Sequence, residues 1–253
     1  MKGMRKDEKL GIKGDLKSEL NDRKKPIKWF EPWEQEKLLQ TAWEYALGER
    51  SVNLKIKPEK NLIPYMLIYL GLHTGARRGE LHALTWDKIN FENKTILIDR
   101  TIEYSQGDTK GRFTTTKTDE DRTIRINDDN VEQLKRYRLW VKEKLLPLRK
   151  DINEVPVFFA SDFGILHSTQ PNKVFTTIVK QAGLKHRRFH DLRHSSASNL
   201  ISEEIYPPKI QRRLGHAKLE TTMKIYAHFF NINDDKLDIA LDNIGVRLRG
   251  RLA

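Results

Sequence analysis

The sequence predicts a mostly helical α+β fold that contains a small three-stranded antiparallel sheet. In most of the chain the apolar residues recur three or four positions apart, which is the spacing of an amphipathic helix. Between residues 86 and 126 the pattern changes to short β-branched or alternating runs, separated by clusters of Asn, Gly and Asp. A chain of 253 residues is also long enough to bury a substantial core.

The N-terminal third predicts a basic arm followed by helices. Residues 1–28 are rich in lysine and poor in large apolar side chains, so we expect a linker or a solvated helix there. Pro32 suits the first turn of a helix, and apolar residues follow it at helical spacing as far as Leu47. A polar loop is expected over residues 48–60.

Two helices joined by a tight turn come next. Residues 62–73 form a strongly apolar helix that Thr74 and Gly75 end, and a short helix is expected after it, as far as Leu84. Arg77 lies in the turn at the start of this second helix, where backbone amide groups favour an anion.

The predicted sheet consists of residues 95–98, 112–116 and 122–126. Lys117 falls at a strand end or turn tip between the last two strands. A long amphipathic helix is then expected over residues 128–149, with one apolar face made of Val131, Leu134, Tyr137, Val141, Leu145 and Leu148.

The C-terminal half predicts a short buried run, several helices and an apolar stripe near the end of the chain. The buried run covers residues 155–160, and a helix over residues 170–183 is closed by its glycine. Near the end of the chain, a last helical stripe contains Leu237, Ala240, Leu241, Ile244 and Leu248.

Charge and composition favour a polyanionic partner and exclude cysteine chemistry. The 47 lysines and arginines outnumber the 35 acidic residues and give a formal net charge of +12, which points toward nucleic acid. The chain has no cysteine, which excludes disulfides, thiolate zinc sites and cysteine nucleophiles. No apolar run approaches the roughly 18 residues of a membrane span, and we find no signal peptide. We therefore expect a cytoplasmic protein with no membrane partner.

Four reactive side chains follow one another in the C-terminal part: His190, Arg193, His216 and Tyr226. His190 and Arg193 are three residues apart and can share a face of a helix. His216 follows a glycine where the IQRRL helix should end, and Tyr226 lies in the next helical segment. Arginine grips phosphate oxygens, histidine moves protons near neutral pH and tyrosine can act as a nucleophile, so this set suits a phosphate. Taken singly, Tyr226 could be a core aromatic and His216 a helix cap.

Five motifs in this order resemble the tyrosine recombinase, or phage integrase, family. They are TGARRGEL (74–81), TKT (116–118), HDLRH (190–194), LGH (214–216) and Tyr226, which Ala227 and His228 follow. The resemblance covers roughly residues 30–245 and implies the catalytic domain of that family. It implies the following catalytic residues: Arg77, Lys117, His190, Arg193, His216 and Tyr226.

The resemblance also implies a role for each of these side chains. Arg77 and Arg193 would clamp the scissile phosphate, Glu80 would support the site, and Tyr226 would be the nucleophile. His190 is the best candidate for the base and Lys117 for the general acid, with Lys110 as a rival in the same hairpin. His216 would donate a hydrogen bond to the phosphate.

No cofactor and no metal are expected. A covalent 3′-phosphotyrosine keeps the energy of the broken bond, so rejoining needs neither ATP nor a metal ion. His190 and His194 are four residues apart, like the pair in H-E-x-x-H, but the intervening residues lack the glutamate. Arg193 would also place a positive charge beside a cation, and no clear third ligand follows.

The predicted function is a site-specific DNA recombinase, an integrase of a mobile element. Type IB topoisomerase-like DNA relaxation and an inactive DNA-binding module of the same fold remain alternatives. The expected partners are double-stranded DNA at specific recombination sites and, on DNA, further copies of the chain in a homo-tetramer, whereas the free protein is expected to be a monomer. The C-terminal stripe could pack onto a neighbouring subunit or fold back on its own domain.

Three regions are expected along the chain. Residues 1–29 form a basic linker or the remnant of an N-terminal core-binding region, residues 30–230 the catalytic domain, and residues 231–253 a C-terminal helix and tail. Integrases of this family usually carry a core-binding domain of about a hundred residues before the catalytic part. The chain is therefore expected to be either a fragment or a short member of the family, with modest and salt-sensitive DNA affinity.

Overall fold

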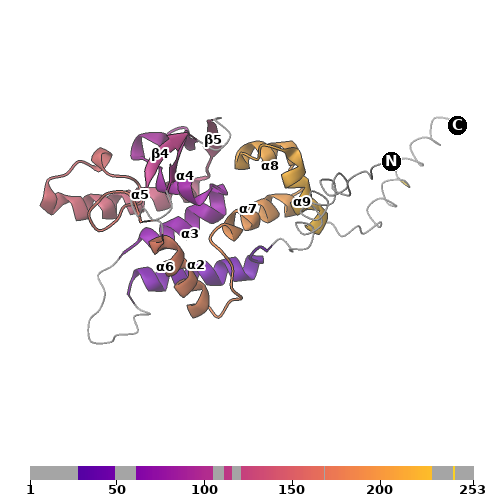
Figure 1. Ribbon diagram of the computed structural model, residues 1–253, viewed down its shortest axis with the longest axis horizontal. Coiled ribbons are helices and arrows are strands. Elements are labelled where there is room, and N and C mark those ends of the chain that lie inside the picture. Colours follow the sequence, from indigo (N-terminus) through magenta and orange to yellow (C-terminus); the bar gives the residue numbers. More distant parts are fainter. Residues whose placement is uncertain are drawn as a thin grey trace, which may run out of the picture.

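The computed structural model describes residues 28–48, 61–104, 111–115, 121–167, 169–229 and 242. Helices predominate, and those at the C-terminal end of the described chain gather at one end of the molecule (Figure 1). The expected basic arm, most of the 48–60 loop and the C-terminal stripe lie outside the described residues, as do Lys110 and Lys117.

The first three helices agree with the sequence prediction to within two residues at each end. They are α2 (Pro32–Ala46), α3 (Ile63–Thr74) and α4 (Arg78–His82). Helix α3 is apolar on nearly every side, and it lies at the centre of the fold, where it packs against α2 and α7 and also contacts α4, α5 and α6.

The remaining helices are α5 (Asp128–Leu145), α6 (Gln170–Gln181), α7 (Asp191–Ser202), α8 (Pro207–Leu214) and α9 (Leu219–Phe229). Single-turn 3-10 helices cover Trp86–Lys88, Leu146–Leu148 and Ile152–Glu154. Helix α5 ends earlier than predicted, and Leu148 lies beyond its end and is 49% exposed, so the prediction that Leu148 belongs to the apolar face of this helix is wrong. Pro147 lacks the amide hydrogen that a continuing helix needs, and the chain tightens there into the 3-10 turn.

A three-stranded antiparallel sheet is present, as predicted, although one of its strands differs from the expected one. It has the order β1 (Ile89–Asn90), β2 (Thr95–Ile98) and β5 (Arg122–Arg125). Strand β4 (Arg112–Thr115) instead pairs with β3 (Arg100–Glu103) in a separate two-stranded sheet. Strand β4 has no fully buried residue, so it gains little from a place in the core sheet and closes a hairpin with the segment that precedes it.

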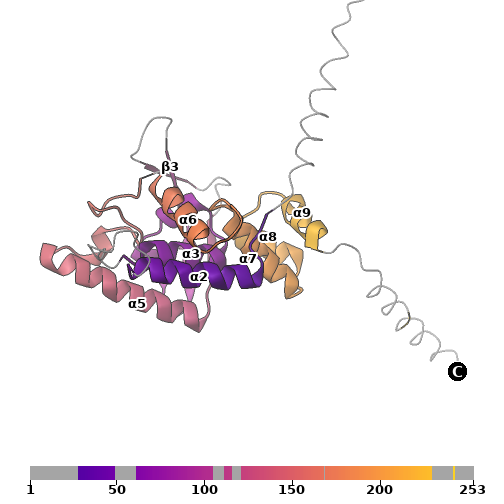
Figure 2. The same ribbon diagram turned by 90° about the horizontal axis from the view of Figure 1, so that it is seen from below.

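Two apolar cores hold the elements together. The larger core joins α2 to α6 with the three-stranded sheet, and α3 runs through it. The smaller core joins α7, α8 and α9 through Ala197, Ile201, Ile210, Leu214 and Ile225. In Figures 1 and 2 these three helices lie at one end of the molecule and α5 at the other. The turn before α4 and the strand β5 meet the smaller core between these ends, and the candidate site forms there.

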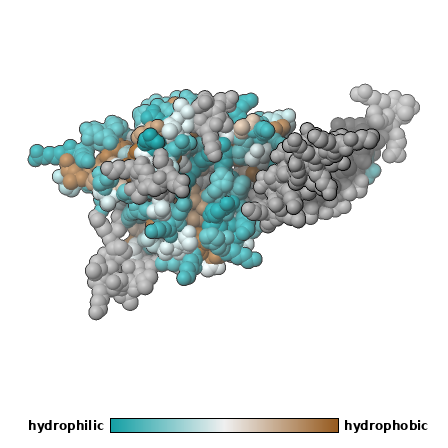
Figure 3. Space-filling model, viewed as in Figure 1, coloured by the Kyte–Doolittle hydropathy of each residue, from teal (hydrophilic) through white to brown (hydrophobic). Residues whose placement is uncertain are grey.

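The described part of the surface is largely polar. Figure 3 shows hydrophilic side chains over most of the coloured face. Within the described residues, no helix has the length and apolar character needed to cross a membrane.

Candidate functional site

A left-handed glycine places Arg77 at the start of α4. Gly75 ends α3 with φ +63°, a conformation that glycine adopts without strain. A Cβ atom at this position would also lie 2.3 Å from a methyl carbon of Leu214 on α8. The turn is therefore packed directly against the smaller core, and Arg77 follows it as the N-cap residue of α4.

Three hydrogen bonds hold Arg77 in place. Its Nη1 donates to Oε1 of Glu80 at 2.8 Å, and its backbone amide donates to the other carboxylate oxygen at 2.7 Å. Its Nη2 donates to the carbonyl oxygen of Gly215 at 2.7 Å, which connects the α4 turn to the end of α8. The Arg77 side chain is still 24% exposed to solvent.

Arg122, which the sequence analysis did not select, is a second cation on Glu80. Its Nη1 and Nη2 donate to the two oxygens of Glu80 at 2.9 and 2.5 Å, and its Nε donates to the carbonyl oxygen of Arg213 at 3.0 Å. Burial by itself would raise the pKa of Glu80, but the bonds to Arg122, with a smaller effect of Arg77, lower that pKa to about 2. The strand pattern contained a signal for the burial of Arg122, because this residue is two positions before the buried Ile124 and shares its face of the strand.

Arg193 is the most deeply buried cation of the site. It projects from α7 and is 3% exposed, and its Nη1 donates to the carbonyl oxygen of Gly75 at 2.8 Å. Its Nη2 is buried and has no hydrogen-bond partner among the described residues. Burial, and then the positive charge of Arg77, lower the pKa of Arg193 to about 9. The two guanidiniums that the sequence selected are therefore close enough to repel each other.

Both predicted imidazoles lie within the field of these arginines. Burial, followed by the charges of Arg193 and Arg77, lowers the pKa of His216 to about 3, and its Nδ1 lies 2.9 Å from the hydroxyl of Thr222. Burial, followed by the charges of His194 and Arg193, lowers the pKa of His190 to about 4. Both rings are therefore neutral at pH 7, and each has one nitrogen that donates a hydrogen bond and one that accepts.

Tyr226 lies on α9 at the edge of the smaller core, and its hydroxyl has a different partner. It is partly buried against that core, and Oη donates to the carbonyl oxygen of Ile205 at 2.5 Å. Burial and then the negative charge of Glu204 raise the pKa of Tyr226. The structure thus gathers Arg77, Glu80, Arg193, His190 and His216, and it leaves the phenol outside the group of charges that act on His216.

Metal ligation finds no support within the part of the chain that the structure describes. No group of three or more His, Cys, Asp or Glu side chains there could hold a metal ion. His190 and His194 do lie together, with ring centroids 5.1 Å apart and nearly perpendicular planes. His190 is the N-cap residue of α7 and does not lie inside the helix.

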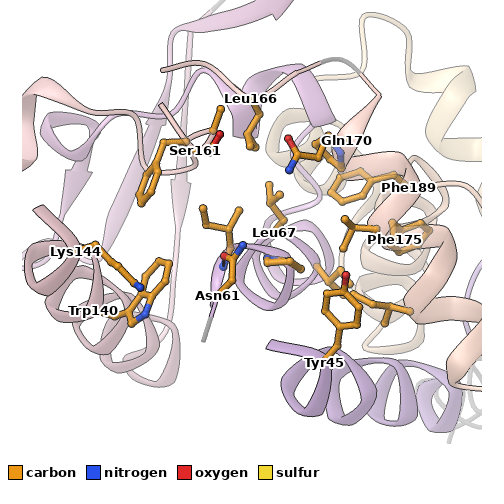
Figure 4. A pocket seen from close by; sticks show the side chains of 18 of the residues that line it. Tyr45, Asn61, Leu67, Trp140, Lys144, Ser161, Leu166, Gln170, Phe175 and Phe189 are labelled. Atoms are coloured by element: carbon orange, nitrogen blue, oxygen red, sulfur yellow. Dashed lines mark hydrogen bonds between the residues drawn. The ribbon is translucent and has the colours of Figure 1, made fainter. Parts of the chain in front are cut away.

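Two pockets lie near these elements, and only one of them borders the site. A basic pocket of about 480 Å³ between α4 and α6 includes Arg78, Arg188 and His190 in its wall. A more apolar pocket of about 490 Å³ lies between α3, α5 and α6, where Trp140 and Lys144 face Phe175 and Phe189 (Figure 4). None of the predicted catalytic residues that the structure describes lines this second pocket, and Phe189 borders both pockets.

The fold is that of tyrosine recombinase catalytic domains. The Tn1549 transposon integrase, in complex with circular intermediate DNA, matches with a TM-score of 0.65 at 19% identity, over 92% of this chain and 77% of that chain. XerA recombinase matches with a TM-score of 0.58 at 19% identity, over 87% of this chain and 64% of that chain.

The chain belongs to the phage integrase family, whose sequence profile matches residues 29–231. A XerC-like tyrosine recombinase of Caldanaerobacter subterraneus is 29% identical over 174 residues, which are 64% of this chain and 44% of the relative. The integrase of Staphylococcus phage L54a is also 29% identical over 174 residues, 68% of this chain and 49% of the relative. The chain thus spans about half the length of the curated relatives it matches.

Proposed function

We propose that the chain is the catalytic part of a site-specific DNA recombinase, an integrase that cuts and rejoins DNA through Tyr226. The observation that carries this proposal is the pair Arg77 and Arg193. The two guanidiniums repel each other in a largely buried site, and Nη2 of Arg193 has no partner among the described residues. Such a pair suits an anion with several oxygens. A DNA phosphodiester provides such an anion.

In the proposed reaction, Oη of Tyr226 forms a bond to the phosphorus and the bond from phosphorus to the 5′ oxygen breaks. The DNA is left with a 3′-phosphotyrosine and a free 5′ hydroxyl. His190 takes the tyrosine proton, and Lys117, which lies outside the described residues, gives a proton to the departing 5′ oxygen. Rejoining reverses these steps, so it needs no ATP.

In the proposed reaction, the charge that develops on the phosphate is stabilised by two arginines and one histidine. Arg77 and Arg193 donate to the non-bridging oxygens, and the neutral ring of His216 donates a further hydrogen bond. Removal of one such donor is expected to slow cleavage on the order of a hundred-fold. Because its pKa is low, the ring of His190 is unprotonated at neutral pH and can accept a proton. The negative charge of a bound phosphate would raise this pKa toward the pH of the reaction.

The comparisons support a DNA substrate. The Tn1549 transposon integrase, whose fold this chain shares, is described in complex with transposon right end DNA, and other relatives are named as integrases and transposases. We expect double-stranded DNA at specific recombination sites, a tetramer of this chain on that DNA, a monomer when free, and activity in the cytoplasm.

A nicked suicide substrate tests the chemistry. Cleavage close to a nick releases a short strand, so a covalent protein–DNA adduct accumulates and can be seen on a denaturing gel. Tyr226→Phe is expected to lose the adduct, whereas the matched variant Tyr206→Phe, which changes a 65% exposed phenol, keeps it. An adduct that survives Tyr226→Phe would overturn the assignment of the nucleophile. DNA binding without an adduct from the unchanged protein would favour an inactive binding module.

Salt dependence tests the mode of binding. Phosphate contacts release counterions, so the affinity for a duplex should fall steeply between about 50 and 200 mM salt. An affinity that hardly changes over this range would contradict binding through the phosphate backbone.

A further inference from the structure

We propose that Arg122 is a positioning residue for the recombination reaction: it occupies both carboxylate oxygens of Glu80 and thereby keeps the charge of Arg77 available to the scissile phosphate. This inference rests on the proposed function of Arg77. Arg122 lies outside the five sequence motifs, and the proposal assigns it no contact with the phosphate.

Arg122 makes more side-chain hydrogen bonds to Glu80 than Arg77 does. Arg122 reaches both oxygens with its two terminal nitrogens, at 2.9 and 2.5 Å, in the bidentate arrangement that is strongest for a guanidinium and a carboxylate. Arg77 makes only one side-chain bond to the same carboxylate, at 2.8 Å, and turns its other terminal nitrogen to the carbonyl oxygen of Gly215. Glu80 is therefore shared between two cations, and Arg122 has the larger share.

The side chains around Glu80 form a cluster with a net positive charge. Arg77, Arg122 and Arg193 carry three positive charges, and Glu80 carries one negative charge, so the cluster has a formal charge of +2. Without Arg122, the carboxylate would be free to bind Arg77 through both oxygens and would neutralise it. The carboxylate would then compete with the phosphate for the same guanidinium.

The surroundings of Arg122 fix it in this orientation. Its side chain is 7% exposed, and its Nε donates to the carbonyl oxygen of Arg213 near the end of α8. Gly215 has φ +71°, and a Cβ atom there would lie 2.9 Å from Nη1 of Arg122. The guanidinium therefore packs directly against the turn at Gly215, where there is no room for a side chain, and it has little freedom to release Glu80.

A simple structural role for this ion pair makes a different prediction from a positioning role. If Arg122 only stabilises the fold, its loss should slow cleavage of any substrate equally. If it acts through the charge of Arg77, the loss should depend on the charge of the scissile linkage. A methylphosphonate replaces one charged oxygen by a methyl group and so removes most of the need for the Arg77 cation.

The experiment measures single-turnover cleavage of suicide duplexes at saturating protein, with either a phosphodiester or a methylphosphonate at the scissile position. Arg122→Met is expected to slow cleavage of the phosphodiester about ten-fold or more, and to slow cleavage of the methylphosphonate much less. Arg125→Met is the matched control, because it changes an exposed arginine on the same strand. It should leave both rates unchanged. Equal slowing of both substrates by Arg122→Met would overturn the proposal.

A second comparison covers the case in which Arg122→Met fails to fold because it removes the bidentate partner of a buried carboxylate. With Glu80→Gln the carboxylate charge is absent, so adding Arg122→Met to it should change the phosphodiester rate less than about three-fold. A further ten-fold loss in the double variant would show that Arg122 acts by another route and would overturn the proposal. An unchanged protein that forms no adduct would instead contradict the proposed function, so the two failures are distinguishable.

Discussion

The hydroxyl of Tyr226 donates a hydrogen bond of 2.5 Å to the backbone carbonyl of Ile205, in the turn between α7 and α8. The charge that acts on its pKa is that of Glu204, whereas the charges of Arg193 and Arg77 act on His216. Attack on a phosphate requires the nucleophile to come within about 3–3.5 Å of the phosphorus. We therefore expect the hydrogen bond from Tyr226 to Ile205 to break, and α9 to shift, when the proposed site assembles on DNA.

The first prediction therefore concerns the mobility of α9 on DNA binding. A duplex that carries the cleavage site should change amide hydrogen exchange in α9, because the bond from Tyr226 to Ile205 must break before attack. Helix α5, at the other end of the molecule, serves as an internal control and should not respond. Saturating DNA that leaves exchange in α9 unchanged would contradict a rearrangement of this helix.

The second prediction concerns anion binding by the free protein. Sulfate should bind between Arg77 and Arg193, since Nη2 of Arg193 has no partner among the described residues. A ligand at a hundred times its dissociation constant adds about 2.7 kcal/mol to the free energy of unfolding. Sulfate should thus raise the thermal midpoint more for the unchanged protein than for Arg193→Met. The control Arg149→Met, at an exposed position, should keep the full response, and an equal response of all three proteins would rule out a specific site.

The third prediction is a loss of stability in mild acid. The pKa values of His82 and His216 are lowered to about 3, and that of His190 to about 4, with burial as the largest cause in each case. In the unfolded chain these groups take up protons near pH 6.5, so the unfolded state binds more protons as the pH falls below that value. The free energy of unfolding should therefore decrease from pH 6.5 toward pH 4.

Glu80 should extend this loss to lower pH. Its pKa is lowered to about 2, so its contribution is complete above about pH 4.5 and is lost as the pH falls toward 2. Denaturant unfolding at pH 5 and 7 measures the effect of the histidines. The variant His216→Asn removes one titrating group and should reduce the difference between the two pH values. A protein that is equally stable at pH 5 and 7 would contradict the neutral, buried state of the imidazoles.

The fourth prediction compares two left-handed glycines. Gly75→Ala and Gly183→Ala both force an alanine into a positive φ, which costs roughly 1–2 kcal/mol. A Cβ atom at Gly75 also lies 2.3 Å from Leu214, whereas at Gly183 the nearest atom is the end of Lys37 at 4.0 Å. Gly75→Ala should therefore reduce the free energy of unfolding by clearly more than Gly183→Ala. Equal losses, measured by denaturant unfolding, would mean that the contact with Leu214 relaxes without cost.

Much of this site could be predicted because its residues lie in short, local patterns. Arg77 and Glu80 are three residues apart at a helix start, and His190 and Arg193 are three residues apart at another, so their relative placement follows from helix geometry alone. Arg122 escaped prediction because an arginine in a short strand is usually exposed. Its burial depends on Glu80, a partner 42 residues away that the pattern of the strand does not indicate.

The pairing of strands shows the same limit. The alternation of apolar residues identified β2, β4 and β5, but it contained no information on which strand lies beside which. The short strand β3 was missed, and it pairs with β4.

The sequence by itself determined the helices, the apolar character of α3, the basic charge and the motifs of the phage integrase family. These depend on periodicity and on residue type, which are properties of neighbouring positions. Only the tertiary structure decided that Arg122 shares Glu80 with Arg77 and that Tyr226 rests on Ile205. Both depend on contacts between elements that are distant in the chain, where packing and the low polarity of the interior decide which charges and hydroxyls meet.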